Sequence, residues 1–242
     1  MMKGFLLTSN QIEILKTPNE FYNTILSLIG KAKKRISITS LYLGTGNLEK
    51  KVVECIENKA KRNGIELNII MDKNRCERIE KGKNSLRLLS PLSEHLYLYN
   101  NINSSHLPFT NYLPSMLKEL LGVFHTKIIV SDNDILITGS NFSNSYFTTR
   151  KDRYMLIRNH SQLSNYLYDY TQSIKSIKYN DNRKEYIFNH REALQKYINN
   201  DSRYDIDRII KSVPNDRIML YPLVRYFLYI DSNEKSQYKR RL

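Results

Sequence analysis

The sequence predicts an α/β fold: a mixed sheet flanked by helices, with a small helical appendage at the C-terminal end. Segments of strand and helix character alternate between residues 11 and 71, which favours parallel strands covered by helices. A further amphipathic segment spans residues 161–177, and a charged linker begins at residue 178. We therefore expect a main domain over residues 1–178 and the appendage over residues 179–242.

Strands are predicted from β-branched or alternating residues, and helices from apolar residues three or four positions apart. The first helix has the clearest start, because Thr17 can cap it, Pro18 suits its first turn and Glu20 follows three residues after the cap. The expected strands are 11–15, 35–41, 66–71, 96–99, one strand containing His125 and Lys127, 135–138, 154–157 and a β-prone edge segment, 217–230. The expected helices are 17–33, 48–62, 116–121, 161–177, 186–198 and 205–212, and residues 72–83 are expected to form a solvated loop.

Length and charge narrow the classes of function. The chain of 242 residues can bury a sizeable core, and its 38 Lys and Arg against 24 Asp and Glu give a formal net charge of +14. This charge favours an anionic partner: nucleic acid, an acidic membrane surface or a phosphorylated substrate. Cys55 and Cys76 form no C-x-x-C pair, and no apolar run reaches the ~18–20 residues that span a bilayer. We therefore expect a reducing compartment and, for any work on lipid, action from the membrane surface.

A histidine and a lysine two residues apart form the centre of the candidate site. The pattern is His125-x-Lys127-x4-Asp132, and a short strand then leads to a Gly-Ser-Asn turn that ends at Asn141. Residues i and i+2 of a strand share a face, so the imidazole and the ammonium are expected side by side. The imidazole can attack phosphorus or move a proton, and the ammonium can hold phosphoryl oxygens. The pattern therefore indicates chemistry at phosphorus.

This motif resembles the signature of the phospholipase D superfamily, in which a Gly/Ser-x-Asn turn follows H-x-K-x4-D. Within it, the sequence is most similar to the eukaryotic-type phosphatidylglycerophosphate synthases, which are CDP-diacylglycerol–glycerol-3-phosphate 3-phosphatidyltransferases. The resemblance covers about residues 11–180, and the stretch 139–154 is its most specific part. The other matching positions are 40–46, Glu49, Met71, Asp72, Arg75, Arg78, Asn84, Ser85, Leu89, Glu119 and Gly122. The resemblance implies a sheet of the phospholipase D type.

The resemblance also implies transfer of a phosphatidyl group from CDP-diacylglycerol to glycerol 3-phosphate, without a metal or another cofactor. One histidine would attack phosphorus to form a phosphohistidine, and a second would protonate the leaving oxygen. His125 and Lys127 are the catalytic candidates, and Asp132 would either orient a group of the motif or serve as a turn residue. Asn141 would hold phosphoryl oxygens, and Ser140 would do the same or fill the turn.

Arginines close to the motif are candidates for binding further phosphate groups. Arg150 and Arg153 would bind a second phosphate, such as that of glycerol 3-phosphate, because a guanidinium fork suits phosphate oxygens. The alternative is an internal ion pair with Asp152 that holds the loop. Arg75 and Arg78 would contact the nucleotide end of the donor, or they would be solvated or structural.

The sequence departs from the family in one respect, because the relatives carry two such motifs that line a single site. The other histidines are His95, His106, His160 and His190, and none of them is followed two residues later by lysine. Residues 221–223 resemble the start of the family's second half. Three explanations stay open: an enzyme that completes its site by dimerising, an inactive remnant, or a fragment.

Three classes of function follow from these observations. The first is the phosphatidyltransferase, as a homodimer peripheral to an acidic membrane surface in a mitochondrion or a mitochondrion-derived organelle. The second is a homodimeric, single-motif phosphodiesterase that acts on nucleic acid or cardiolipin. The third is an inactive relic that binds acidic lipid or a partner. The stretch 139–154 favours the first class, whereas the single motif favours the second.

Overall fold

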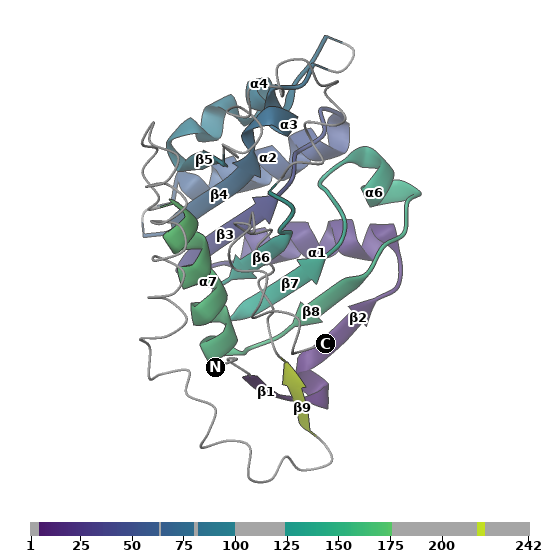
Figure 1. Ribbon diagram of the computed structural model, residues 1–242, viewed down its shortest axis with the longest axis vertical. Helices are drawn as coiled ribbons and strands as arrows, with labels where there is room; N and C mark the ends of the chain where they lie inside the picture. Colours follow the sequence, from purple (N-terminus) through teal and green to yellow (C-terminus); the bar gives the residue numbers. More distant parts are fainter. Residues whose placement is uncertain (1–4, 63, 80–81, 100–123, 176–216, 221–242) are drawn as a thin grey trace, which may run out of the picture.

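The computed structural model describes residues 5–62, 64–79, 82–99, 124–175 and 217–220, and a seven-stranded sheet forms its centre (Figure 1). The strand order is β2-β8-β7-β6-β3-β4-β5. The strands are β2 (Ile12–Leu15), β3 (Arg35–Ser40), β4 (Glu66–Asp72), β5 (Leu96–Tyr99), β6 (Ile128–Ser131), β7 (Asp134–Thr138) and β8 (Tyr154–Ile157). Strands β3, β4 and β5 run parallel, and the remaining pairs are antiparallel. The predicted mixed sheet is therefore confirmed.

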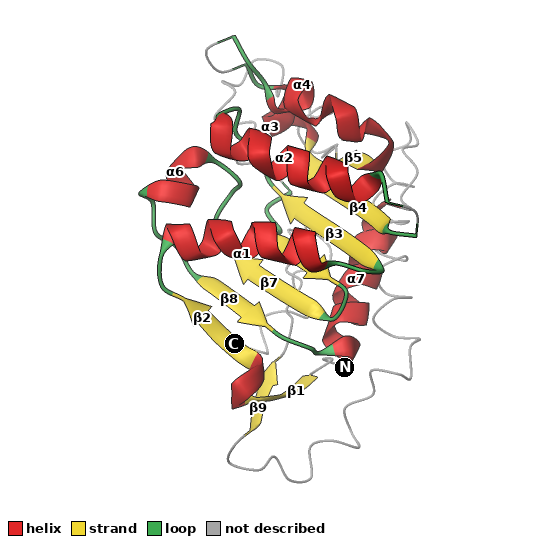
Figure 2. Cartoon of the chain, turned by 180° about the vertical axis from the view of Figure 1, so that it is seen from behind, coloured by secondary structure: helices red, strands yellow, loops and turns green. Residues whose placement is uncertain are grey.

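Helices cover both faces of this sheet, as the two opposite views show (Figures 1 and 2). One face carries α1 (Pro18–Lys31) and α2 (Asn47–Ala60), and the short helix α6 (Asn144–Thr148) packs against both. The helices α3 (Lys73–Glu77) and α4 (Ser85–Leu89) lie beside α2, and α7 (Ser161–Lys175) lies on the other face. Short 3-10 helices occupy Ser9–Gln11 and Ser90–His95.

The alternation of strand residues divides the core between the two faces. Ile36 and Ile38 of β3 belong to the larger cluster beneath α1 and α2, which also contains the fully buried Phe21. Val130 of β6 and Ile135 of β7 belong to the cluster beneath α7. Each such side chain contributes roughly 1.5–3 kcal/mol by its burial, so packing on both faces stabilises the sheet.

The predicted start of α1 is confirmed in detail. The Thr17 side chain accepts a hydrogen bond from the backbone N–H of Glu20 at 3.1 Å, and Pro18 is the first helical residue. The Glu20 carboxylate reaches back to the N–H of Lys16 at 2.7 Å. The first bond satisfies a donor that a helix start leaves free, and the second fixes the turn from β2 into α1.

Two local predictions are wrong. The strand β6 begins at Ile128, so His125 and Lys127 belong to the extended segment before it rather than to the strand. The expected loop 72–83 instead begins with Asp72, the fully buried last residue of β4, and continues into α3. The many charged residues of this region suggested exposure to solvent, but the Asp72 carboxylate is buried. Charge alone does not reveal a hydrogen-bond partner that is distant in the sequence.

The predicted helices 116–121, 186–198 and 205–212 lie outside the described residues. Of the expected appendage, only residues 217–220 are described. They form the strand β9 (Arg217–Leu220), which pairs antiparallel with β1 (Phe5–Thr8) in a separate two-stranded sheet. The division at residue 178 stays a prediction. Within the described part of the chain, no helix is both long and apolar enough to cross a membrane.

Candidate active site

The loops that carry the motif lie together at one edge of the sheet, the edge formed by the ends of its strands (Figure 1). The parallel strands β3 and β4 end at this edge, and β6, which is antiparallel to β3, begins there. The strand β7 ends at the same edge because it is antiparallel to β6. Loops beyond the carboxyl ends of parallel strands are the usual position of ligand sites in open α/β sheets. The motif therefore lies where this topology favours a binding site.

Lys127 is the buried cation of the site, with only 3% of its surface exposed. Its Nζ donates a hydrogen bond to the backbone carbonyl of His125 at 2.9 Å. Burial lowers the pKa of Lys127 to about 8, although the negative charge of Asp152 acts in the opposite direction. The amine is therefore still mostly protonated at neutral pH, and it can stabilise negative charge on a phosphoryl group.

The His125 side chain is exposed, so a substrate can reach its imidazole. The surrounding protein partly removes water from the imidazole, and this desolvation lowers the pKa of His125. The positive charge of Lys127 lowers the pKa further. The carboxylate of Asp152 partly opposes this shift. The neutral imidazole, which is the nucleophilic form, is therefore favoured at neutral pH.

The segment that leads into His125 is held by Asp72. One carboxylate oxygen of Asp72 accepts a hydrogen bond from the N–H of Phe124 at 3.0 Å, and the other accepts one from the N–H of Arg75 at 3.0 Å. After the motif, the N–H of Thr138 donates to the carbonyl of Lys127 at 3.2 Å. The backbone on both sides of His125 is thus fixed, which limits the positions that its imidazole can take.

The Gly-Ser-Asn turn that follows β7 is fixed to the loop after β3. The N–H of Gly44 donates to the carbonyl of Phe142 at 2.6 Å, and Leu43 and Phe142 form a parallel bridge. The Oγ of Ser140 and the Oδ1 of Asn141 are buried, and neither has a hydrogen-bond partner among the described residues. Buried polar atoms are normally paired, so these two side chains are the groups expected to engage a polar ligand.

The Glu49 carboxylate contacts both the loop after β3 and the loop after β7. Its side chain is 1% exposed, and its Oε1 accepts a hydrogen bond from the N–H of Asn144. A Cβ on Gly44 or on Gly46 would lie too close to this carboxylate, at 2.7 Å in the case of Gly46, so a larger residue at either position would displace the Glu49 side chain. Sequence reasoning gives Glu49 only a role at a helix start. The G-x-G-x-x-E spacing is the signal that could have revealed its contact with both loops.

Asp152 is the residue of this site that sequence reasoning missed, since it was considered only as an ion-pair partner. Its charge acts on both His125 and Lys127. Its Oδ1 accepts a hydrogen bond from the N–H of Arg153 at 2.7 Å and lies 2.5 Å from where a Cβ on Gly139 would stand. The contact with Gly139 brings this carboxylate to the end of β7, beside the motif. No pattern local to residue 152 indicates this contact.

The two arginines predicted to bind phosphate have different surroundings. The guanidinium of Arg150 lies over the ring of Tyr146, 4.5 Å from its centre. Arg153 is exposed and directly precedes β8. In the described part of the chain, neither guanidinium forms an ion pair with Asp152, so the alternative of an internal ion pair is not observed.

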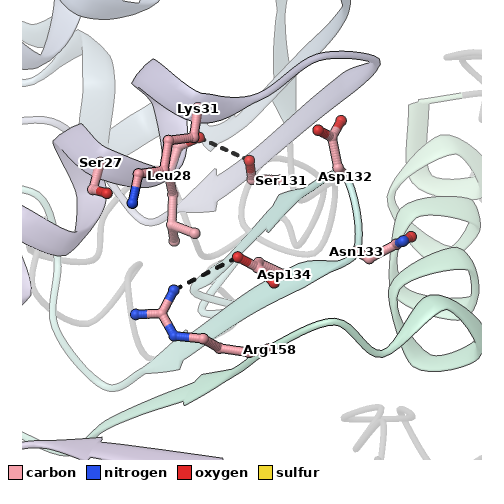
Figure 3. A pocket seen from close by; sticks show the side chains of 8 residues that line it. All are labelled: Ser27, Leu28, Lys31, Ser131, Asp132, Asn133, Asp134 and Arg158. Atoms are coloured by element: carbon pink, nitrogen blue, oxygen red, sulfur yellow. Dashed lines mark hydrogen bonds and ion pairs between the residues drawn. The ribbon is translucent and has the colours of Figure 1, made fainter. Parts of the chain in front are cut away.

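The structure does not bring Asp132 to His125 and Lys127. Asp132 follows the last residue of β6, at the opposite edge of the sheet. Its carboxylate accepts hydrogen bonds from three successive backbone N–H groups, those of Lys33 and Lys34 at 2.8 Å and that of Arg35 at 3.1 Å. It also borders a small pocket at the β6–β7 turn (Figure 3). The geometry gives Asp132 the role of fixing the start of β3.

Two of the other four histidines are described, and both lie at that opposite edge. His95 precedes β5. His160 precedes α7, where its Nδ1 accepts a hydrogen bond from the N–H of Leu163 and its Nε2 is bonded to the carbonyl of Leu6. His106 and His190 lie outside the described residues. Within the described ranges, no second histidine stands beside His125, and no group of three or more His, Cys, Asp or Glu residues is arranged to hold a metal ion.

Comparison with known proteins agrees with this geometry. The family model described as "Cardiolipin synthase, PLD-like domain" matches residues 25–176. The probable CDP-diacylglycerol–glycerol-3-phosphate 3-phosphatidyltransferase of Dictyostelium discoideum is 36% identical over 194 residues, which are 75% of this chain and 33% of that protein. The mitochondrial CDP-diacylglycerol–glycerol-3-phosphate 3-phosphatidyltransferase of Homo sapiens is 29% identical over 189 residues, which are 73% of this chain and 34% of the human protein. The chain thus spans about a third of the length of these relatives.

Solved structures share the fold. Phosphatidylserine synthase from Haemophilus influenzae superposes with a TM-score of 0.60 at 22% identity, over 81% of this chain and 45% of that one. NucT from Helicobacter pylori superposes with a TM-score of 0.50 at 16% identity, over 72% of this chain and 96% of that one. Since the family model covers more than half of the sequence, the chain belongs to the phospholipase D-like family of the cardiolipin synthase domain.

Proposed function

We propose that this chain forms the catalytic site of a phosphatidyltransferase, which converts CDP-diacylglycerol and glycerol 3-phosphate into phosphatidylglycerophosphate and CMP. The observation that carries the proposal is the meeting of His125, Lys127 and the Gly-Ser-Asn turn at one sheet edge. The substrates are those in the names of the relatives from Dictyostelium discoideum and Homo sapiens. A neutral imidazole next to a buried ammonium supports attack on a phosphodiester.

The reaction proceeds in two balanced steps. In the first step, a ring nitrogen of His125 bonds to the phosphorus of the phosphatidyl group, and the bond from this phosphorus to the CMP oxygen breaks. A second histidine, which must enter this step as imidazolium, donates its proton to the departing oxygen and becomes neutral. In the second step, that histidine removes the proton of a glycerol 3-phosphate hydroxyl, whose oxygen attacks phosphorus as the bond to His125 breaks. Lys127 and Asn141 stabilise the charge on the non-bridging oxygens.

The second histidine is proposed to be His125 of a second copy of the chain. The described histidines His95 and His160 face the opposite edge of the sheet and cannot reach the phosphorus. A two-fold axis places the same surface of both copies face to face, so it can bring two copies of one motif to one substrate. Asp132 is proposed to support the fold, and Asp152 to orient His125 and to balance the charge of Lys127.

The enzyme is proposed to act from the surface of an acidic membrane. The net charge of +14 supports attraction to anionic lipid, which adds to the binding of a diacyl substrate. The mitochondrial relatives support a mitochondrion or a mitochondrion-derived organelle as the location.

A second candidate is favoured by one observation: the sequence has a single H-x-K motif, which suits a homodimeric phosphodiesterase acting on nucleic acid or cardiolipin. The two functions are separated by incubating the purified chain with labelled CDP-diacylglycerol in vesicles, with and without glycerol 3-phosphate. Parallel samples contain single-stranded DNA or cardiolipin. Release of more than one equivalent of CMP that needs the acceptor and disappears in His125→Ala supports the transferase. Cleavage of DNA or cardiolipin without CMP release supports the phosphodiesterase, and inactivity in every sample supports the relic.

A further inference from the structure

Two arginines stack on tyrosines in the loops around the candidate site. The Arg150 guanidinium lies 4.5 Å from the centre of the Tyr146 ring, and the Arg75 guanidinium lies 4.9 Å from that of Tyr42. Burial raises the pKa of Tyr146, the charge of Arg150 opposes the shift, and Tyr42 and Asp152 add to it. Tyr146 is thus within electrostatic range of Arg150, of Tyr42 and of Asp152, the carboxylate that acts on His125.

The backbone of Arg150 is fixed by two hydrogen bonds, and its guanidinium lies over the ring of Tyr146. Its backbone N–H donates to the carbonyl of Ser145 at 2.6 Å, and its own carbonyl accepts a hydrogen bond from the Tyr154 hydroxyl at 3.4 Å. Stacking on Tyr146 occupies one face of the guanidinium and leaves the N–H groups along its edge available. Among the described residues, these N–H groups have no hydrogen-bond or ion-pair partner.

Asp72 connects Arg75 to the segment that precedes His125. Asp72 accepts hydrogen bonds from the N–H of Arg75 and from the N–H of Phe124, the residue before His125. Tyr42 follows β3 and Arg75 follows β4, so both project from the carboxyl ends of neighbouring parallel strands. Tyr42 and Arg75 therefore lie at the same edge of the sheet as His125 and Lys127.

We propose that Arg150 on Tyr146, with Arg75 on Tyr42 beside it, forms a subsite for a phosphomonoester dianion next to the reacting phosphorus. This inference rests on the proposed function, in which both the leaving molecule, CMP, and the entering molecule, glycerol 3-phosphate, carry such a group. A guanidinium edge binds two phosphate oxygens at once, and among the described residues Arg150, which lies over the ring of Tyr146, forms no ion pair with the Asp152 carboxylate. One subsite thus serves both half-reactions and rejects glycerol, which lacks the phosphate.

The test is a binding measurement that does not depend on turnover. Calorimetric titration of the purified full chain with CMP, with glycerol 3-phosphate and with glycerol gives the dissociation constants. Arg150→Gln is expected to weaken binding of both phosphomonoesters by roughly 10–100-fold, the effect of losing a charge-assisted pair. Lys151→Gln, which removes the same charge from the adjacent exposed residue, is expected to change binding by less than about threefold.

A second pair of variants isolates the stacking. Tyr146→Phe keeps the ring and is expected to retain binding, whereas Tyr146→Leu removes it and is expected to weaken binding by roughly tenfold. Because Tyr146 is buried, thermal unfolding of both variants shows whether the Leu variant is folded at the titration temperature. Loss of binding in a folded Tyr146→Leu protein supports the subsite.

The outcomes distinguish the subsite from the reaction. If the phosphomonoesters bind through Arg150 but no CMP is released from CDP-diacylglycerol, the subsite stands and the proposed transferase does not. If CMP release needs glycerol 3-phosphate but Arg150→Gln leaves both dissociation constants unchanged, the subsite is overturned and the transferase stands. Weakened binding of CMP alone or of glycerol 3-phosphate alone overturns the shared role and assigns Arg150 to that one molecule. Equal binding of glycerol and glycerol 3-phosphate overturns a phosphate subsite altogether.

Discussion

Asp132 and His125 lie at opposite ends of β6, although they are only seven positions apart in the motif. An extended chain rises about 3.3 Å per residue, so their backbones are separated by roughly 20 Å. The Asp132 carboxylate is instead bonded to the backbone of Lys33, Lys34 and Arg35. Proximity in the motif therefore does not mean proximity in the site.

The first prediction concerns Asp132→Asn, which should lower stability and spare the chemistry. Asparagine tolerates the φ of +50° at this position but keeps only one acceptor oxygen, so we expect a loss of about 1–2 kcal/mol in the free energy of unfolding. The value of kcat should change less than about threefold. Urea denaturation and steady-state kinetics check both parts, and a loss of kcat in a protein of unchanged stability would give Asp132 a catalytic role.

Asp132 should also make the free energy of unfolding depend on pH. Burial alone would raise the pKa of Asp132, but hydrogen bonds from Arg35, Lys34 and Lys33 and the charge of Arg35 bring it below its ordinary value of 3.8. The carboxylate therefore stabilises the fold above that value, and its contribution disappears as pH falls through the lowered pKa. The free energies of unfolding of wild type and Asp132→Asn should converge on acidification, which urea denaturation at several pH values measures. A constant difference would contradict this.

The second prediction uses the buried amine of Lys127. Its pKa is lower in the folded protein than in the unfolded chain, where it is near 10.5. Between about 8 and 10.5 the unfolded chain binds more protons, so the free energy of unfolding should rise with pH across this window. Relative to Lys127→Met, wild type should gain on the order of 1–2 kcal/mol between about pH 7.5 and about pH 9.5. Urea denaturation at both pH values checks this.

The exposed Lys151 provides the matched control for that measurement. Lys151→Met removes the same charge from the surface, so its difference from wild type should stay constant within about 0.5 kcal/mol over the same pH range. A pH-dependent difference of equal size in both variants would show that the effect does not arise from the burial of Lys127.

The third prediction concerns the contact between Gly139 and Asp152. A Cβ on Gly139 would lie 2.5 Å from the Asp152 carboxylate, so Gly139→Ala should displace this carboxylate from His125 and Lys127. We expect kcat to fall roughly 10–100-fold with little change in melting temperature, as for other misplaced catalytic groups. Gly30→Ala is the control, because nothing lies within 4 Å of its Cβ. Full activity in Gly139→Ala would show that the position of Asp152 does not matter.

The fourth prediction tests whether one site uses two copies of His125. Wild type and His125→Ala are mixed in equal amounts after denaturation and refolded together. If both copies act on one phosphorus, only dimers with two wild-type chains are active, and activity should be about a quarter of that of all-wild-type protein. Independent sites would give about half, and that value would contradict the shared site.

The sequence was sufficient for features that depend on local patterns. Alternating apolar residues predicted most strands, and Thr17 and Pro18 predicted the start of α1 within one residue. His125, Lys127 and Asn141 were predicted as site residues from the spacing of a family motif, and the structure places the segments that carry them at one edge of the sheet. These features are encoded over a few neighbouring residues, where propensity and spacing are informative.

Features that depend on distant contacts were not predictable. The carboxylate of Asp72 is buried because it binds the N–H of Phe124, which lies 52 positions away. Glu49 binds the N–H of Asn144 across 95 positions, and Asp152 meets Gly139 only after the chain has turned through α6. The separation of Asp132 from the site follows from the direction of β6, which spacing along the sequence does not reveal.

The central claim is that His125 forms a covalent bond to the phosphatidyl phosphorus, and trapping this intermediate tests it most directly. The protein is incubated with CDP-diacylglycerol without glycerol 3-phosphate, quenched at alkaline pH and analysed by peptide mass spectrometry. We predict a phosphatidyl adduct on His125 that appears with one equivalent of CMP and disappears when glycerol 3-phosphate is added. Acceptor-dependent CMP release from His125→Ala, or an adduct on another residue, would contradict the account.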